Sequence, residues 1–247
     1  DSINYAKRIQ EAILPSKEIK YKIFPEAFVF FQPKDIVSGD FYWFAEKNGK
    51  RIIATVDCTG HGVPGAFMSM IGNAFLNEII NEIGITTPSV ILDELRKKII
   101  FSLKQTGADG ENKDGMDISL LTFDRDNRCV EFAGANNPLW KISNMTLEET
   151  KGNKQPIGMY SGDIIPFTNH TIELKKGDSL YIFTDGFADQ FGGENGKKLK
   201  YKKIQEMLLS NNNISMKEQE KYMNEFMNKW KGDLEQVDDI LFIGIKV

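Results

Sequence analysis

Four aspartates lie at the ends of apolar segments whose composition predicts β-strands: Asp40, Asp57, Asp185 and Asp238. Asp57, for example, directly follows the run Ile-Ile-Ala-Thr-Val. Carboxylate oxygens are the ligands that Mg²⁺ and Mn²⁺ prefer in proteins. A fold that brought these four strand ends together would therefore create a divalent-cation site.

Each of these aspartates also has a simpler interpretation. Asp-Gly and Asp-Asp pairs, such as those at positions 185–186 and 238–239, often form turns or helix caps. As a set they favour ligands, because uncompensated carboxylates gathered at one end of a sheet would repel one another without a cation. The spacing alone does not show that they converge, so both interpretations stay open at this point.

Composition limits the classes of function. The chain of 247 residues has a formal net charge of −4 and no dense Lys/Arg block, which argues against binding to nucleic acid or to an anionic membrane. No apolar run approaches the roughly 20 residues of a membrane span. The two cysteines, Cys58 and Cys129, cannot form a framework of bridges. We therefore expect a cytoplasmic domain that contacts neither nucleic acid nor membrane through this chain.

The order of predicted elements indicates an α+β fold. Strands are predicted over 27–31, 41–45, 51–56, 118–123, 130–133, 139–142, 167–174, 179–183 and 240–247. Helices are predicted over 65–83, from Thr87 and Pro88 onward, and from a capping box at Ser215 and Glu218 to Gly232. Many antiparallel strands with two groups of helices favour a β-sandwich flanked by helices on both faces.

The first residues repeat apolar side chains at helical spacing, at Ile3, Ala6, Ile9 and Ile13. Pro15 ends this pattern. We predict a helical linker over residues 1–20 and one large domain over residues 21–247. The linker could lie on its own domain, or it could be the end of a signalling helix that carries a signal from an upstream sensor. A homodimer formed through residues 2–14 is a further option.

Four segments, taken together, are similar to the motifs of a known family. Residues 33–42, 56–62, 184–189 and 237–240 resemble, in order and spacing, the motifs of PP2C-type (PPM) serine/threonine phosphatases. Within that superfamily the match is to the bacterial branch that includes SpoIIE and RsbU. The likeness runs from about residue 28 to residue 247. It implies a helix-flanked antiparallel β-sandwich that hydrolyses phosphoserine or phosphothreonine with two Mn²⁺ or Mg²⁺ ions.

The resemblance also implies a role for each motif residue. Asp57 would bridge both ions, and the backbone carbonyl of Cys58 would join one of them. Asp185 and Asp238 would complete the other, with Asp40 on the side of the second ion, partly through water. Water held between the ions would attack phosphorus in line, so no side-chain nucleophile is required.

Two residues near these motifs have less certain roles. Asp239 is an alternative to Asp238 as the ligand, and motif alignment favours Asp238. His61 could act as an accessory general acid, but a structural role in its Gly-His-Gly loop is favoured. The glycine-rich segment 191–198 is either a flap that meets substrate or a solvated loop.

The resemblance implies partners as well. Relatives often act on a phosphorylated anti-sigma-factor antagonist, and we take such a phosphoprotein as the hypothetical substrate. An upstream sensor domain, which could tether the full-length protein to a membrane, would control the activity. The competing hypothesis is a catalytically silent domain that keeps the fold and signals by protein contact.

Overall fold

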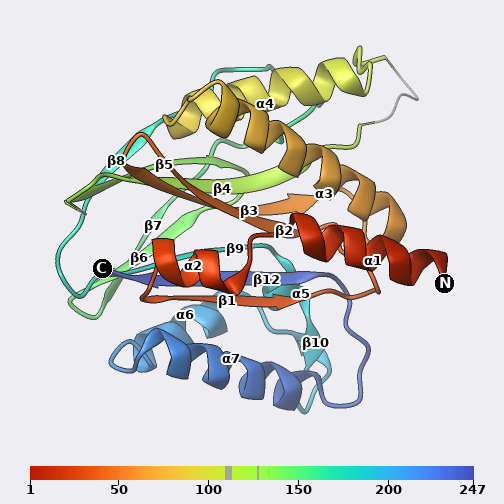
Figure 1. Cartoon of the computed structure of the whole chain (residues 1–247). Helices are drawn as coiled ribbons and strands as arrows, with labels where there is room; N and C mark the ends of the chain where they lie inside the picture. Colours follow the sequence, from red (N-terminus) through yellow and green to blue (C-terminus); the bar gives the residue numbers. More distant parts are fainter. Residues whose placement is uncertain (109–112, 127) are drawn as a thin grey trace.

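Two five-stranded antiparallel sheets form the centre of the computed structural model, which describes residues 1–108, 113–126 and 128–247 (Figure 1). The first sheet has the order β1 (Ala27–Gln32), β12 (Ile240–Lys246), β9 (Ser179–Phe183), β6 (Leu139–Ser143) and β7 (Thr146–Thr150). The second has the order β2 (Phe41–Lys47), β3 (Lys50–Cys58), β4 (Met116–Phe123), β5 (Cys129–Ala135) and β8 (His170–Glu173).

Helices cover the outer face of each sheet. The second sheet is covered by α3 (Gly62–Leu76), the π-helix η1 (Asn77–Glu82) and α4 (Pro88–Ser102). The first sheet is covered by α5 (Gly186–Asp189), α6 (Tyr201–Ser210) and α7 (Met216–Lys231). This arrangement confirms the predicted α+β sandwich with helices on both faces. In the described part of the chain, no helix has the length and apolar character needed to cross a membrane.

The side chains of β3 show why the centre of this strand, residues 52–56, is rich in apolar residues. Ile53 points into the layer between the sheets, where it packs with Ile182 and Leu241. Ile52 and Ala54 point the other way, into the layer beneath α3 and α4. Strands buried on both faces lose the alternation of apolar and polar residues. Burial of each large aliphatic side chain contributes about 1.5–3 kcal/mol, so β3 is strongly fixed in register.

Several boundaries differ from the sequence prediction. The helix predicted over residues 65–83 begins at Gly62 and changes to the π-helix η1 after Leu76. The capping box at Ser215 is confirmed, and Gly232 ends α7 with φ of 54°. Several elements were not predicted, among them α2 (Lys17–Ile23), β7, α5 and α6, and the short strands β10 (Phe191–Gly192) and β11 (Lys197–Lys198). β7 is an edge strand whose side chains are mostly open to solvent, so it lacks the apolar signal of a buried strand.

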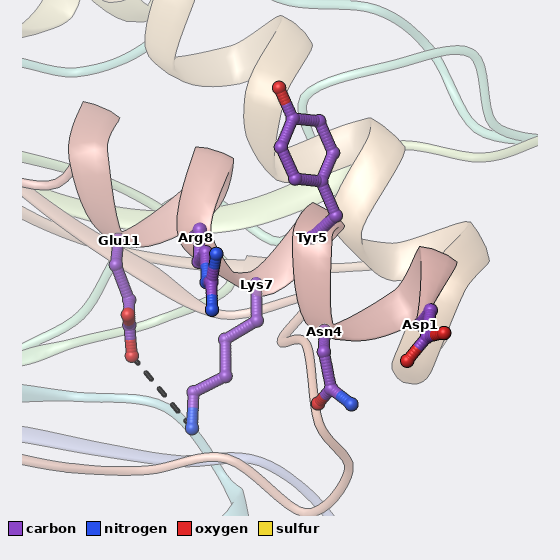
Figure 2. A pocket seen from close by; sticks show the side chains of 6 residues that line it. All are labelled: Asp1, Asn4, Tyr5, Lys7, Arg8 and Glu11. Atoms are coloured by element: carbon purple, nitrogen blue, oxygen red, sulfur yellow. Dashed lines mark ion pairs between the residues drawn. The ribbon is translucent and has the colours of Figure 1, made fainter.

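The N-terminal helix α1 (Ser2–Ile13) is attached to the rest of the chain by a buried glutamine. Gln10 Nε2 donates to the Ser38 carbonyl oxygen at 2.6 Å and to Ser69 Oγ at 2.9 Å, while Ser38 N donates to Gln10 Oε1 at 2.9 Å. Figure 2 shows polar side chains on the outer surface of α1, including the ion pair between Lys7 and Glu11 at 3.8 Å. In this structure α1 therefore lies on its own domain; the division at residue 20 and a homodimer through this segment stay predictions.

Candidate metal centre

Aspartates from both sheets meet at one edge of the sandwich. In the second sheet, Asp57 at the end of β3 is paired in register with Asp117 at the start of β4. Asp40 precedes β2, whose first residue pairs with Val56. In the first sheet β9 and β12 are neighbours, so Asp185 after β9 lies beside the segment that leads into β12 from Asp238.

The electrostatics of Asp40 and Asp57 show that these carboxylates share one site. Burial raises the pKa of Asp40 well above its ordinary range, and the negative charge of Asp57 raises it further. Burial also raises the pKa of Asp57, followed by the charges of Asp185, Asp117 and Asp238, although a hydrogen bond with Asp40 acts in the opposite direction. The four sequence-predicted aspartates therefore converge, and the structure adds Asp117 to them.

Asp185 and Asp117 complete the cluster at its outer side. The Asp185 side chain is open to solvent in part, yet surrounding protein atoms and then the charges of Asp189 and Asp238 raise its pKa to about 6. Lys198 opposes this shift. Burial raises the pKa of Asp117, and Asn136 Nδ2 donates to its Oδ1 at 2.7 Å.

Sequence reasoning missed Asp117 because its own segment carries only a weak signal and belongs to none of the four motifs. Its importance comes from the register that pairs it with Asp57, and that register depends on the folded sheet. The only local signal is an aspartate at the start of an apolar strand, which resembles the pattern of the other four.

A threonine joins Asp40 to the opposite sheet. Thr184 Oγ1 donates to Asp40 Oδ2 at 2.6 Å, and Leu241 N donates to Thr184 Oγ1 at 3.1 Å. Both Asp40 and Thr184 are almost fully buried. The position of the Asp40 carboxylate is therefore fixed by the pairing of β9 with β12.

The two neighbouring aspartates before β12 have different environments. Asp239 is buried, and its two carboxylate oxygens accept from Lys34 N at 2.8 Å and from Gly39 N at 2.7 Å. It therefore holds the loop that leads to Asp40. Asp238 is only half-buried, and its charge raises the pKa of Asp40, Asp57 and Asp185.

Glycines permit the close approach of the strand ends. A Cβ atom at Gly186 would overlap the carbonyl oxygen of Asp239, and a Cβ at Gly39 or Gly65 would overlap the carbonyl oxygen of Gly60. Side chains at these positions would push the segments apart. Gly39, Gly65 and Gly186 thus allow the segments that carry the aspartates to approach one another closely.

His61 and Cys58 flank Asp57 but have separate environments. His61 is exposed, with Nδ1 at 2.7 Å from Asp35 Oδ2 and Nε2 at 3.0 Å from Lys34 Nζ. These contacts connect two loops and support the structural role favoured for His61. The Cys58 thiol is buried, and burial raises its pKa, so it is a poor nucleophile.

The donor set fits hard divalent cations that keep part of their water shell. Among the described residues, Asp40, Asp57 and Asp117 form no ion pair with Lys, Arg or His. Within the same residues, no three His, Cys, Asp or Glu side chains are arranged to enclose an ion by themselves. Backbone carbonyls and water would have to complete the coordination, which is the usual situation for Mg²⁺.

Comparison with known proteins agrees with this description. The SpoIIE family, described as Stage II sporulation protein E, matches residues 47–247. No curated protein sequence matches the chain. The solved SiaA-PP2C domain of Pseudomonas aeruginosa is 33% identical with a TM-score of 0.88, over 100% of this chain and 96% of that one.

More distant structures share the fold. The PP2C phosphatase domain of SpoIIE from Bacillus subtilis, solved with a fragment of its regulatory domain, has a TM-score of 0.70 at 18% identity, over 90% of this chain and 63% of that one. RsbX, solved in complex with magnesium, has a TM-score of 0.60 at 15% identity, over 90% and 94% of the two chains. The chain therefore belongs to the SpoIIE family and is a PP2C-type phosphatase domain of the bacterial SpoIIE/RsbU branch.

Proposed function

We propose that this chain is an active, metal-dependent protein serine/threonine phosphatase. The observation that carries the proposal is the convergence of five aspartates from both sheets at one edge of the sandwich. Keeping these groups close costs stability, because the charges of Asp57, Asp117, Asp185 and Asp238 each raise the pKa of a neighbouring aspartate. A domain that signalled only by contact would have no physical need for this cluster.

The residues implied by the family resemblance would hold two Mn²⁺ or Mg²⁺ ions. Asp57 would serve both ions, the Cys58 carbonyl would join one of them, and Asp185 and Asp238 would complete the other. Asp40 would lie on the side of the second ion, partly through water. When bound, the ions would supply an activated water for in-line attack on phosphorus and neutralise charge on the phosphoryl oxygens.

The surrounding residues would position these ligands. Thr184 fixes the Asp40 carboxylate, and Asp239 fixes the loop before Asp40 through two backbone N–H groups. Asp117 increases the negative potential beside Asp57 and so favours cation binding. We assign Asp238 as the ligand and Asp239 as a positioning residue. Motif alignment also favours Asp238 as the ligand.

The substrate proposed is a phosphoserine or phosphothreonine protein, such as a phosphorylated anti-sigma-factor antagonist. This assignment rests on the family resemblance, as does the proposal of a cytoplasmic output domain controlled by an upstream sensor. Asp185 at the outer side of the site is open to solvent, so a phosphorylated side chain of another protein can approach it.

The proposal can be tested with hydrolysis of p-nitrophenyl phosphate and of a phosphoserine peptide, each with and without Mn²⁺. We expect Mn²⁺-dependent turnover by the purified chain and its loss in the variants Asp57→Asn and Asp185→Asn. The exposed Asp163→Asn serves as the matched control and should keep full activity. Mn²⁺ binding without turnover of either substrate would contradict the proposal and favour the silent binding module.

A further inference from the structure

A basic groove lies between the β10–β11 hairpin (Phe191–Gly192 and Lys197–Lys198) and the C-terminal end of α7. We call it the hairpin groove. Its volume is about 1420 Å³. Six lysines line it: Lys197, Lys198, Lys200, Lys203, Lys229 and Lys231. Only three acidic residues, at positions 194, 225 and 233, face them, although the chain as a whole has a net charge of −4. The positive charge is thus a local feature of this groove.

The groove has an aromatic floor that is firmly attached to the hairpin. Trp230 Nε1 donates to the Gln190 carbonyl oxygen at 3.0 Å, and Gly193 N donates to the Trp230 carbonyl oxygen at 2.8 Å. The rings of Phe226 and Trp230 stack with centroids 6.3 Å apart. Lys203 Nζ lies 5.4 Å from the centre of the Trp230 ring. The groove is therefore preformed and combines apolar surface with cations.

One contact and a short stretch of chain link the groove to the candidate metal centre. The chain passes from Asp185 through α5 directly into β10, and Figure 1 shows β10 between α5 and α7. Lys198 Nζ donates to Asp189 Oδ2 at 2.9 Å, and the charges of both residues act on Asp185. A ligand chain in the groove can thus lead toward the aspartate cluster.

Most of the lysines have no acidic partner. Among the described residues, Lys197, Lys200, Lys229 and Lys231 form no ion pair. The backbone of Lys200 has φ of 67° and ψ of 153°, a strained conformation for a residue with a side chain. Its N–H donates to the Ala188 carbonyl oxygen at 2.8 Å, which holds this turn beside α5. The lysine charges are thus available to a ligand.

We propose that the hairpin groove binds an acidic segment of the phosphorylated protein substrate, next to the residue that carries the phosphate. This inference rests on the proposed phosphatase function and names the class of substrate. The groove exceeds the roughly 300–1,000 Å³ of small-molecule pockets, which favours several residues of polypeptide. Lysines offer mobile point charges, which suit Asp and Glu side chains without a fixed geometry. Phe226 and Trp230 would contact an apolar side chain of the same segment.

The test reverses charge in the groove and compares two substrates. The groove variant is Lys229→Glu with Lys231→Glu, and the control is Lys202→Glu with Lys217→Glu, which lie on α6 and α7 outside the groove. The substrates are two phosphoserine peptides of the same length, one flanked by Asp and Glu and the other by Asn and Gln. For the acidic peptide, we expect the groove variant to lower kcat/KM by about tenfold, and added salt to reduce this difference.

Hydrolysis of the neutral peptide and of p-nitrophenyl phosphate should stay unchanged in the groove variant. The assignment would be overturned if the groove and control variants lost the same share of kcat/KM for the acidic peptide. It would also be overturned if the groove variant lost the same share of kcat/KM for both peptides. The use of p-nitrophenyl phosphate separates the two proposals, because it tests the metal centre without occupying the groove. Normal hydrolysis of this compound without preference for the acidic peptide would reject the groove and keep the phosphatase.

A binding measurement makes the test independent of catalysis. The labelled acidic peptide without phosphate would be titrated with the wild-type chain and with Asp57→Asn, with fluorescence anisotropy as the readout. We expect both to bind it and the groove variant to bind at least fivefold more weakly, because two partly exposed charges that attract the peptide are reversed. An RNA oligonucleotide of equal charge that competes as well as the peptide would overturn the assignment to a protein segment. Binding by wild type and Asp57→Asn without any turnover would instead reject the phosphatase and keep the groove.

Discussion

Thr184 and Asp40 form a 2.6 Å hydrogen bond that connects the two sheets at the candidate metal centre. Thr184 stands between β9 and Asp185, whereas Asp40 precedes β2 in the other sheet. The hydroxyl also accepts from Leu241 N at 3.1 Å, so it is fixed by β12. One side chain therefore sets the distance between the aspartates of the two sheets.

We expect Thr184→Val to lower both stability and metal binding. The valine keeps the shape of threonine but leaves Asp40 and Leu241 N without their buried partner, which costs about 1–3 kcal/mol for each unsatisfied group. Thermal unfolding and Mn²⁺ titration would measure the two effects. Thr184→Ser keeps the hydroxyl and should retain most of the stability and most of the Mn²⁺ affinity. Equal losses of stability and Mn²⁺ affinity in the valine and serine variants would contradict this role of the hydrogen bond.

Asp238 and Asp239 should respond in opposite ways to the same substitution. Asp239→Asn places an amide NH₂ opposite a backbone N–H, so we expect the metal-free protein to become less stable by about 1–3 kcal/mol. Asp238→Asn removes a charge that repels its neighbours, so the metal-free protein should keep or gain stability while Mn²⁺ affinity falls. The comparison of unfolding and Mn²⁺ titration in the two variants checks this. A stable Asp239→Asn protein that no longer bound Mn²⁺ would make Asp239 the ligand.

The general architecture could be predicted from the sequence because burial leaves a local signal. Runs such as residues 52–56, in which Thr55 is the one polar residue, predict strands covered on both faces, and the motif order predicted the family. Most of the missed elements are short or lie at an exposed edge. β7 is a solvated edge strand, and α6 is a short helix of 10 residues, so neither shows a long apolar pattern.

The candidate site was predicted only where its residues are part of a motif. Asp40, Asp57, Asp185 and Asp238 belong to the family motifs, and in the folded chain their charges act on one another, while their role as ligands stays a prediction. The position of Asp117 depends on strand register, which is fixed by contacts between distant segments. Asp238 and Asp239 likewise differ in the backbone N–H groups that reach their carboxylates. Two adjacent aspartates do not reveal in the sequence which of them accepts these hydrogen bonds.

Gln10 couples the N-terminal helix to the segment that carries Asp40. Its amide satisfies both the N–H and the carbonyl of Ser38, two residues before Asp40, in a buried environment. We expect Gln10→Leu to lower the unfolding temperature and to weaken Mn²⁺ binding, because the Ser38 N–H would lose its buried partner and pull the loop toward water. Glu11→Ala changes the exposed side of the same helix and serves as the control. Unchanged Mn²⁺ binding in Gln10→Leu would mean that α1 is only attached to the domain and does not position Asp40.

The effect of pH on the metal-free protein follows from the raised carboxylate pKa values. Asp185 has a pKa of about 6 in the folded protein against an ordinary value of 3.8. Between these two pH values the folded state binds more protons than the unfolded state, so the free energy of unfolding decreases as pH rises. The raised pKa values of Asp40 and Asp57 act in the same direction.

Divalent cations should reverse this destabilisation, since they compete with protons for the same oxygens. We expect the metal-free chain to unfold at a lower temperature at pH 7.5 than at pH 5, and Mn²⁺ to raise the unfolding temperature much more at pH 7.5. Asp185→Asn should reduce the difference in unfolding temperature between pH 5 and pH 7.5, because it removes one of the titrating groups. Asp163→Asn should leave this difference unchanged. An equal Mn²⁺ effect at both pH values would contradict binding at the aspartate cluster, because a cation held there must displace protons that are bound at pH 5 and largely absent from Asp185 at pH 7.5.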